Sequence, residues 1–516
     1  MAVTVAAAST PLPPEASARL MAICLFFGLA SLAWGYNIGI MATIYVHPGF
    51  IEALHKPSKA TTGFITSIYY VGTWISYIYL GHVLADRYGR RVAAANGVLI
   101  TAVGAALQAS ADGAKAMILG RITCGVGLAI VSSSVPLYQR LFLKTNVAPA
   151  KHRGRYVVIN HIGLVAGLAV AFWTGFGISH WESERGTYYG WRISMALQFI
   201  PEVMFLAGVF FCPETPRWLV EHGRSAAARR SLAYLRALEP SSEQVNRELR
   251  EIEQDVERRK VAAKQSWTML FTHRPLFNRL WRAALLSFMG QMAGNTSMKY
   301  YLPTILMNLG LERKMTLMTA GIETTLKIFC TMFDSWLVDR YGRTRTLVAS
   351  CFIMSFSLLL NGALPIAYPK NSNPVADYVC IVFIFIYTFG FSIGFGPAAW
   401  LYGSEIFPTD FRARGLNIAA SASSIGAIIS SQTWPVGMQK IGSKTHFIFM
   451  STNLVSAFIV WLYYPETSGR SLEDMDALFN PTFKPIMHSE GESERYRDDV
   501  GEDIDNTVPG PRSSRA

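Results

Sequence analysis

Twelve long apolar runs, spread along the whole chain, limit its possible folds more than any other feature. A helix needs about 20 apolar residues to cross the hydrocarbon core of a bilayer, so each run predicts one membrane-spanning helix. We place these helices at residues 19–42, 61–82, 93–111, 115–138, 156–178, 192–212, 280–308, 315–337, 346–367, 377–403, 416–438 and 445–464. The chain is therefore predicted to be an all-α membrane protein with 12 transmembrane helices.

The composition excludes the main alternatives to a membrane protein. Of the 516 residues, 51% are hydrophobic and 16% are charged, whereas a soluble protein carries roughly a quarter charged residues. A soluble enzyme and a disordered protein are thereby excluded. The net charge of +12 is typical of cytoplasmic loops beside anionic lipid. We expect the lipid bilayer to be the partner of these basic residues, and no nucleic acid.

Polar segments divide the chain into five parts. A tail at 1–18 precedes a six-helix half at 19–212, and a polar stretch at 213–279 separates it from a second six-helix half at 280–464. The polar stretch has dense charge at helical spacing, which predicts short amphipathic helices, with Ser241 and Gln244 as a capping box. The tail at 465–516 is polar and acidic after about residue 480, which predicts disorder there.

Basic residues in the short loops predict the orientation of the chain. They gather in the loops that follow the second, fourth, eighth and tenth spans, and in the central polar stretch. The positive-inside rule therefore puts these loops and both termini in the cytoplasm, with the polar stretch as a cytoplasmic helical insert. We expect a multi-pass protein of the plasma membrane.

An internal repeat relates the two halves. The segment LeuAlaAspArgTyrGlyArg at 84–90 returns as LeuValAspArgTyrGlyArg at 337–343, which is 253 residues later. ProGluThr at 213–215 returns at 465–467, which is 252 residues later. Each copy lies after the corresponding span of its half. Two halves of parallel topology, related by an axis along the membrane normal, describe a known transporter architecture.

These segments resemble signatures of the major facilitator superfamily and, within it, of the sugar porter family. The matching residues are 81–91, 213–219, 394–408 and 465–473, and the resemblance extends from about residue 20 to about residue 480. It implies the major facilitator fold, in which two six-helix halves enclose one binding site near the bilayer midplane. It also implies alternating access, in which that site faces each side of the membrane in turn.

Charged residues in the repeated loops are candidates for a gate. An Asp beside several Arg at the cytoplasmic helix ends can form ion pairs, each worth about 0–1 kcal/mol when exposed, which suits a contact that opens repeatedly. The candidates are Asp86, Arg87, Arg90, Arg91, Arg153, Glu214 and Arg217 in the first half, and Asp339, Arg340, Arg343, Glu405, Arg412, Glu466 and Arg470 in the second. The alternative is that these residues only determine the topology.

The first half departs from the repeat at one position. Tyr402 is followed three positions later by Glu405, but the residue three positions after Tyr138 is Leu141. The segment 140–146 also carries about five extra residues relative to the second half. Either the gate of the first half is weakened, or the segment results from a misjudged splice junction, the interpretation that we slightly favour.

Charged residues within predicted spans cost about 2.5–3.5 kcal/mol at a helix centre, so they are functional candidates. The resemblance implies Asp in proton-coupled members at the position of Asn37, which cannot titrate, and this favours uniport. Glu202 and Glu323 are candidates for a proton site. Glu323 also precedes Lys327 by one helical turn, so a self-neutralising ion pair is the alternative.

The sugar-binding pattern of the family is only partly present. Gln291 and Asn295 are retained, as is Trp400, whose indole could stack on a sugar ring. The replaced positions, where the resemblance implies mainly amide side chains, are His161, Thr296, Lys327, Ser423 and Ser424. With Asn37, these residues form our candidate substrate site.

The replaced side chains argue that the substrate is not simply glucose, because each desolvated hydroxyl group of a sugar without a hydrogen-bond partner costs about 1–3 kcal/mol. Lys327 and His161 would suit a carboxylated polyol such as a quinate-like acid. We therefore predict a secondary transporter for a small polar solute, namely a sugar, a polyol or a sugar acid.

Two alternatives remain open, namely an efflux transporter for a specialised metabolite and a non-transporting nutrient sensor. The sequence contains no GxxxxGK[ST] and no HExxH motif, which disfavours an ATP-driven pump or a membrane enzyme. We expect no cofactor and no metal, and protons are an open second partner.

Overall fold

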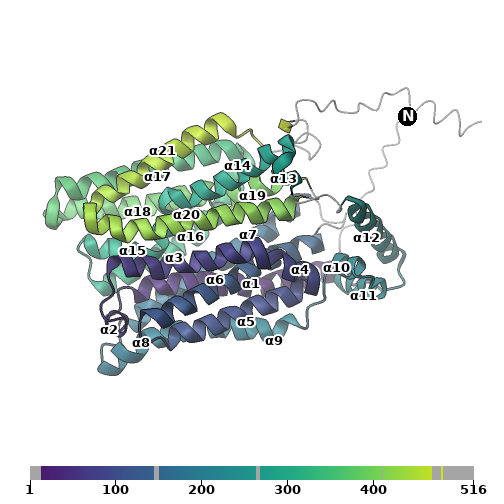
Figure 1. Cartoon of the computed structure of the whole chain (residues 1–516), viewed down its shortest axis with the longest axis horizontal. Helices are drawn as coiled ribbons and strands as arrows, with labels where there is room; N and C mark the ends of the chain where they lie inside the picture. The colour runs from purple at the N-terminus through teal and green to yellow at the C-terminus, as the bar shows by residue number, and fades with distance from the viewer. Residues whose placement is uncertain (1–12, 144–149, 263–267, 409–410, 468–477, 480–516) are drawn as a thin grey trace, which may run out of the picture. The chain divides into compact units, whose positions relative to one another are not determined.

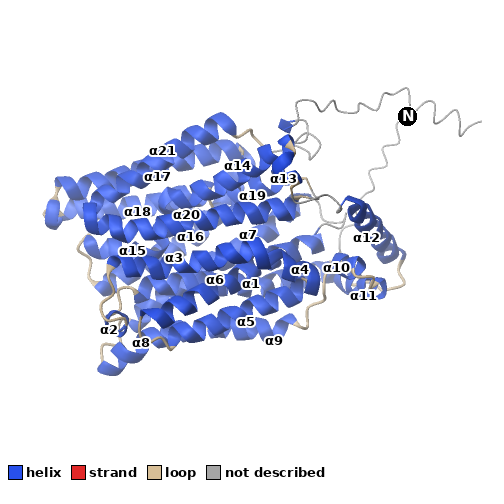
Figure 2. Cartoon of the chain, viewed as in Figure 1, coloured by secondary structure: helices blue, strands red, loops and turns tan. Residues whose placement is uncertain are grey.

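The computed structural model describes residues 13–143, 150–262, 268–408, 411–467 and 478–479. Within these ranges the chain consists of helices joined by short loops (Figure 2). The long helices lie side by side and run lengthwise through a bundle (Figure 1). The apolar runs of the sequence therefore form helices, as predicted.

The first half contains six spans. They are α1 (Pro14–Ile44), α3 (Lys59–Ile75) continued by η1 (Ser76–Leu80) and α4 (Gly81–Tyr88), α5 (Arg90–Ala109), α6 (Ala114–Leu143), α7 (Ala150–Ile178), and α8 (Glu184–Ala196) with α9 (Phe199–Val209). A short helix, α2 (Pro48–Ala53), follows α1. The first span begins at Pro14 instead of residue 19, because proline is well placed in the first turn of a helix.

The second half repeats this arrangement. Its spans are α14 (Arg274–Gly290) continued by η2 (Gln291–Asn295) and α15 (Thr296–Asn308), α16 (Arg313–Tyr341), α17 (Arg343–Ala367), α18 (Pro374–Gly394) with α19 (Pro397–Ile406), α20 (Arg412–Ile441) and α21 (Thr445–Tyr463). Two single turns, η3 (Pro369–Asn371) and η4 (Gly442–Lys444), lie in the loops. Each predicted span corresponds to one of these helices or helix pairs.

Not every span meets a simple test of length and hydropathy. Eight segments of the described chain are long and apolar enough to cross a membrane, and one of them, Arg414–Tyr463, contains most of α20 and all of α21. The span of α3 and the span of α14 and α15 are broken by the π-helical turns η1 and η2, which leave shorter pieces. The helix α16 carries Glu323 and Lys327. The spans that fail are thus the interrupted and charged ones.

Small residues bring helices α1 and α7 into close contact. An added Cβ at Gly167 would lie 2.0 Å from the carbonyl oxygen of Leu32, and one at Gly35 would lie 1.8 Å from the carbonyl oxygen of Leu164. At Gly163 the nearest atom would be the carbonyl oxygen of Gly28, at 2.9 Å. Glycine therefore lets the two backbones approach, as small-residue pairs do in membrane helices.

The polar stretch between the halves forms four short helices, α10 (Pro216–Glu221), α11 (Ser225–Arg236), α12 (Glu243–Ala262) and α13 (Met269–Thr272). Helices α10, α11 and α12 share a small apolar core that includes Trp218, Leu232 and Val245. The capping residue predicted for α12 is wrong by one position, because the hydroxyl of Ser242, not Ser241, accepts from the N–H of Val245 at 3.4 Å.

The two ends of the bundle differ in what covers them. Helices α10–α12 lie beside α4 at one end, which we call the insert end (Figure 1). Their contact includes a hydrogen bond of 2.8 Å from the indole of Trp218 to the carbonyl of Asp86. Helices α2 and α8 lie at the other end, which we call the opposite end.

Candidate functional site

The repeated motifs form a helix cap in each half. Gly89 and Gly342 precede α5 and α17 with φ of +96° and +89°, and a Cβ at either would lie 2.5 Å from a carboxylate oxygen. That carboxylate belongs to Glu214 in the first half and to Glu466 in the second. Only glycine fits such a position, because L side chains rarely adopt this φ.

The capping glutamates accept backbone N–H groups at the start of the next helix. Glu214 accepts from the N–H of Arg91 at 3.1 Å, and Glu466 accepts from the N–H groups of Arg343 and Thr344 at 2.8 and 3.0 Å. These N–H groups have no partner within their own helix. The ProGluThr repeat and the AspArgTyrGlyArg repeat are therefore the two sides of one structural contact.

Ion pairs surround the cap of the first half. Arg90 pairs with Asp86 at 3.4 Å and with Glu221 of α10 at 3.6 Å. Arg217 pairs with Asp255 of α12. Glu221 therefore supplies a carboxylate to Arg90 from the insert.

The second half has a more direct arrangement. Arg343, the counterpart of Arg90, pairs with Glu405 of α19 at 3.1 Å. The other carboxylate oxygen of Glu405 accepts from the hydroxyl of Thr467 at 2.8 Å. Arg412 donates to the carbonyl of Phe407 at 2.9 Å. Arg343 and Glu405 belong to the same half, whereas Glu221 and Asp255 belong to the insert.

The remaining gate candidates are placed as follows. Arg91 donates to the carbonyl groups of Phe210 and Cys212. The exposed guanidinium groups of Arg87 and Arg340 lie over the neighbouring rings of Tyr88 and Trp336. Arg153 and Asp339 lie on α7 and α16. Arg470 lies outside the described residues, as do residues 144–146 of the segment 140–146 for which a splice error was considered.

A polar group at the centre of the bundle contains one residue that sequence reasoning missed, Arg121 of α6. Its guanidinium donates to the side-chain oxygen of Asn37 and to the hydroxyl of Tyr300, both at 3.1 Å. It also lies 4.5 Å from the ring centroid of Tyr69. Asn37 in turn donates to the amide oxygen of Gln198 at 2.8 Å. Since Tyr300 belongs to α15, Arg121 joins the two halves.

Glu202 lies one helical turn beyond Gln198, in the last span of the first half. It is 1% exposed, and neither carboxylate oxygen has a hydrogen-bond partner among the described residues. Burying a charged carboxylate without partners costs several kcal/mol or more. Glu202 therefore differs from Glu323, whose carboxylate accepts a hydrogen bond from the hydroxyl of Thr388.

The alternative of an ion pair between Glu323 and Lys327 is not formed, because no salt bridge or hydrogen bond joins these two described side chains, although their opposite charges act on each other. The ammonium of Lys327 instead lies 5.3 Å from the ring centroid of Phe391 on α18. Lys299 of α15, which sequence reasoning also missed, lies 6.0 Å from the same centroid. His161 lies on α7, and a Cβ added at Gly396 would lie 3.7 Å from its Nε2. The joint role of His161 and Lys327 in a substrate site stays a prediction.

Most of the remaining candidates lie on α15, α20 and the turn η2. The amide of Gln291 donates to the hydroxyl of Ser423 at 3.0 Å, and the hydroxyl of Thr296 donates to the oxygen of Gln291 at 2.5 Å. The hydroxyl of Ser424 bonds that of Thr73 on α3 at 2.9 Å, which joins the halves. Asn295 is buried within η2. Trp400 lies on α19.

The turn η2 interrupts the helical hydrogen bonding of its span next to this polar group. Gly294 has φ of +103°, and the carbonyl of the preceding Ala293 is turned toward neighbouring helices. It accepts from the hydroxyl of Tyr387 at 3.1 Å and from the amide of Asn453 at 2.9 Å. Side chains therefore replace the helical hydrogen bond that the break removes, as membrane burial demands.

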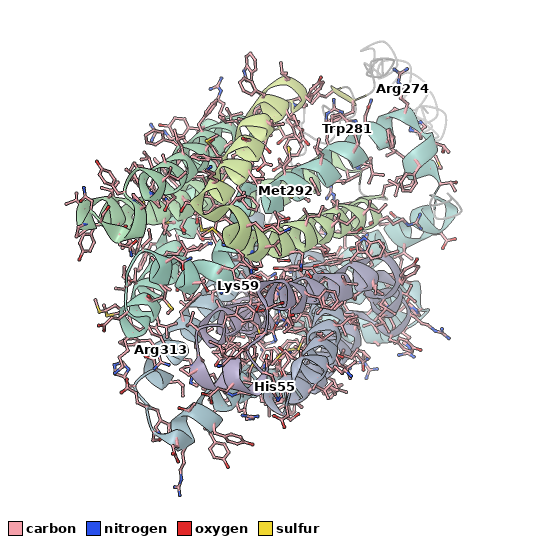
Figure 3. All side chains as sticks on the ribbon, turned by 60° about the vertical axis from the view of Figure 1, so that its left-hand side comes forward. His55, Lys59, Arg274, Trp281, Met292 and Arg313 are labelled. Carbon is pink, nitrogen blue, oxygen red and sulfur yellow. The ribbon has the colours of Figure 1, made fainter. Side chains whose placement is uncertain are left out.

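At the opposite end, several contacts join the two halves. The ring of Tyr45 stacks on that of Tyr301, whose hydroxyl donates to Thr66 at 3.0 Å. Lys314 pairs with Glu182 at 2.7 Å, and this hydrogen bond and charge lower the pKa of Glu182. Figure 3 shows Lys59 and Arg313 toward this end of the bundle, and Arg274 and Trp281 toward the other.

A groove of about 330 Å³ opens between the halves at this end. Its polar lining residues include Lys56 and Lys59 from the first half and Asn308 and Gln439 from the second. Its apolar floor includes Trp434. No carboxylate is among the described residues that line it.

Two six-helix halves with a shared cap motif, and a buried polar group between them, define a multi-pass membrane transporter of the major facilitator fold. The profile of the family described as sugar (and other) transporter matches residues 23–479. The chain therefore belongs to this family, whose members are secondary transporters of small polar solutes.

Named relatives fall within the same class. The chain is 29% identical to the MFS-type transporter criB of Aspergillus cristatus, over 88% of this chain and 92% of the relative. It is 28% identical to the low-affinity glucose transporter HXT1 of Saccharomyces cerevisiae, over 88% and 81%. It is 27% identical to a probable quinate permease of Aspergillus terreus, over 95% and 94%.

Solved structures show the same fold. The proton:xylose symporter XylE, a structure with bound 6-bromo-6-deoxy-D-glucose, superposes with a TM-score of 0.72 at 22% identity. The superposition covers 90% of this chain and 99% of that one. This similarity supports the assignment of twelve transmembrane helices in two halves.

Proposed function

We propose that the protein moves its solute by alternating access, with the polar group between the halves as the single binding site. The observation that carries this proposal is the meeting of buried polar side chains from both halves, of which Arg121 and Tyr300 are the centre. A site built from both halves changes its exposure when the halves rotate against each other. The contacts at the opposite end correspond to a conformation closed on that side.

We infer that the protein lies in the plasma membrane and that its insert end faces the cytoplasm. Both termini lie on the same side. The support is the concentration of basic residues in the loops at this end. Gate candidates such as Arg90 and Arg343 pair with carboxylates at this end. We expect contacts between the halves to form here when the binding site opens to the other side.

We propose uniport, because the residue opposite Arg121 is Asn37 and not a carboxylate. An amide keeps its hydrogen bond to the guanidinium but cannot release a proton. Glu202 and Glu323 are the alternative proton sites of the pathway.

The experiment is a solute panel with purified protein in proteoliposomes, with and without an imposed proton gradient. Uniport requires flux of the solute down its own gradient. It also requires that the solute does not accumulate when only a proton gradient is imposed. Accumulation driven by protons, and its loss in Glu202→Gln or Glu323→Gln, would instead identify a proton site. If no polar solute moved at all, the proposed function would be wrong.

A further inference from the structure

Two buried or half-buried ammonium groups lie near the carboxylate of Glu323. Lys327 is 7% exposed, and Lys299 lies on the neighbouring helix α15. Glu323 is the carboxylate nearest to Lys327 on the same helix, and its hydrogen-bond partner is Thr388. His161 approaches from α7 of the first half, with its Nε2 3.7 Å from a Cβ added at Gly396, between α18 and α19. The cluster therefore carries more positive than negative charge.

The ring of Phe391 compensates this charge only in part. Both ammonium groups lie within 6.0 Å of its centroid, at a distance where a ring face attracts a cation. Such contacts are worth about 0.5–2 kcal/mol each, whereas an unpaired charge inside a membrane costs about 2.5–3.5 kcal/mol even on the mildest scale. The cluster is thus incomplete without a further anionic partner.

Side chains with hydroxyl and amide groups lie close to Lys299 along the chain. Thr296 precedes Lys299 by one helical turn, and its hydroxyl is bonded to Gln291, which is bonded to Ser423. Such side chains bind hydroxyl groups of a ligand, because each can both donate and accept. An anionic group beside Lys299 would lie next to these hydroxyl partners when attached to a polyol.

The groove at the opposite end has the same sign of charge. Lys56 and Lys59 line it, and the described lining residues include no Asp or Glu. A cleft lined by one sign of charge raises the local concentration of solutes of the opposite sign. Two separate places on the pathway therefore favour an anion.

We propose that the transported solute is a small hydroxylated carboxylate, whose carboxylate lies between Lys299 and Lys327 with His161 facing it. This inference rests on the proposed transport function and names the substrate class of the same site. The carboxylate supplies the negative charge that the cluster lacks, and the polar groups of α15 and α20 bind the hydroxyl groups.

The test uses proteoliposomes of the full chain and four labelled probes, namely quinate, its neutral amide quinamide, myo-inositol and glucose. We expect quinate to enter about tenfold or more efficiently than quinamide, because the lost charge-assisted contacts are worth at least that factor. Entry of quinate alone carries net negative charge, so an inside-positive potential should accelerate it. Glucose and myo-inositol should show no response to the potential.

Substitutions test the contribution of the two lysines separately from that of the rest of the pathway. Lys299→Gln and Lys327→Gln should each raise the KM for quinate about tenfold, and the double variant should transport quinamide as well as it transports quinate. The matched control is Lys440→Gln, which changes an exposed lysine at the end of α20. It should leave both the KM and the potential dependence unchanged.

Each outcome decides between the two proposals. If neutral probes enter and quinate does not, or if quinate and quinamide enter equally in the unsubstituted protein, the anion proposal is wrong and the transport function stands. If none of the four probes enters, both proposals fail. The comparison of quinate with quinamide needs no variant, so poor folding of a lysine variant does not affect it.

Discussion

Gly342 lies directly against the carboxylate of Glu466, so that an added Cβ would be 2.5 Å from its Oε2. The same relationship joins Gly89 and Glu214 in the first half. The two sequence signatures of each half therefore form one contact. The glutamate caps the start of the next helix, and only glycine leaves room for its carboxylate there.

The first prediction follows from this contact. Gly342→Ala should destabilise the protein by about 1–3 kcal/mol, because alanine must adopt a left-handed backbone and displace the carboxylate. Thermal unfolding in detergent measures this effect. Gly177→Ala is the control, because an added Cβ there meets nothing within 4 Å. Equal melting temperatures for the two variants would contradict the role of the cap.

The second prediction concerns the partner of Arg121. Asn37→Asp places a carboxylate at the 3.1 Å contact with the guanidinium, and a carboxylate can exchange a proton where an amide cannot. We expect solute flux to become dependent on an imposed proton gradient. Flux in proteoliposomes with and without that gradient is the measurement, and unsubstituted protein is the control. A variant that ignores the gradient would argue against this position as the coupling site.

The third prediction compares two ion pairs. Arg343 and Glu405 have side chains that are 11% and 28% exposed, so a double-mutant cycle with Gln at both positions should give a coupling energy of about 0.5–3 kcal/mol. The exposed pair Arg19 and Glu15, at 3.9 Å, should give about 0–1 kcal/mol. Denaturant unfolding measures both cycles. A coupling energy no larger than that of the exposed pair would show that Glu405 contributes little.

The fourth prediction is a pH dependence at the opposite end. Burial, followed by the positive charge of Arg313, lowers the pKa of His47 to about 4. The unfolded chain protonates this residue near pH 6.5, so its stabilising contribution is complete above that pH and is lost as the pH falls toward 4. In His47→Gln, we expect a smaller drop in melting temperature between about pH 7.5 and about pH 5.

A second variant supports the interpretation of that experiment. Arg313→Gln removes one of the two causes, so its pH-dependent loss of stability should lie between that of unsubstituted protein and that of His47→Gln. If His47→Gln lost stability as steeply as the unsubstituted protein, another group would be responsible.

The fold could be predicted from the sequence because lipid imposes a length and an apolar composition on each span. Even the spans that fail a hydropathy test, such as the charged helix α16, are recovered through the repeat. Local composition therefore places most spans, and the repeat between the halves places the others.

The site could be predicted less well, because its contacts depend on which helices meet. Arg121 and Lys299 are single charges within apolar runs and could have been found by the cost of burying them. Their partners could not, since Asn37 and Phe391 lie on other helices at unrelated distances along the chain. The spacing of one helical turn likewise indicates that Lys327 pairs with Glu323. The ammonium of Lys327 instead lies over the ring of Phe391, on another helix.

The ion pairs at the two ends of the bundle have different consequences for turnover. At the insert end, Arg90 and Arg343 have carboxylate partners in the insert or in their own half, so we expect a rotation of the halves to leave these pairs in place. At the opposite end, the contacts of Tyr301 with Thr66 and of Lys314 with Glu182 join the halves and must separate. We therefore expect damage to the first set to lower the yield of assembled protein, and damage to the second to change the rate of each cycle.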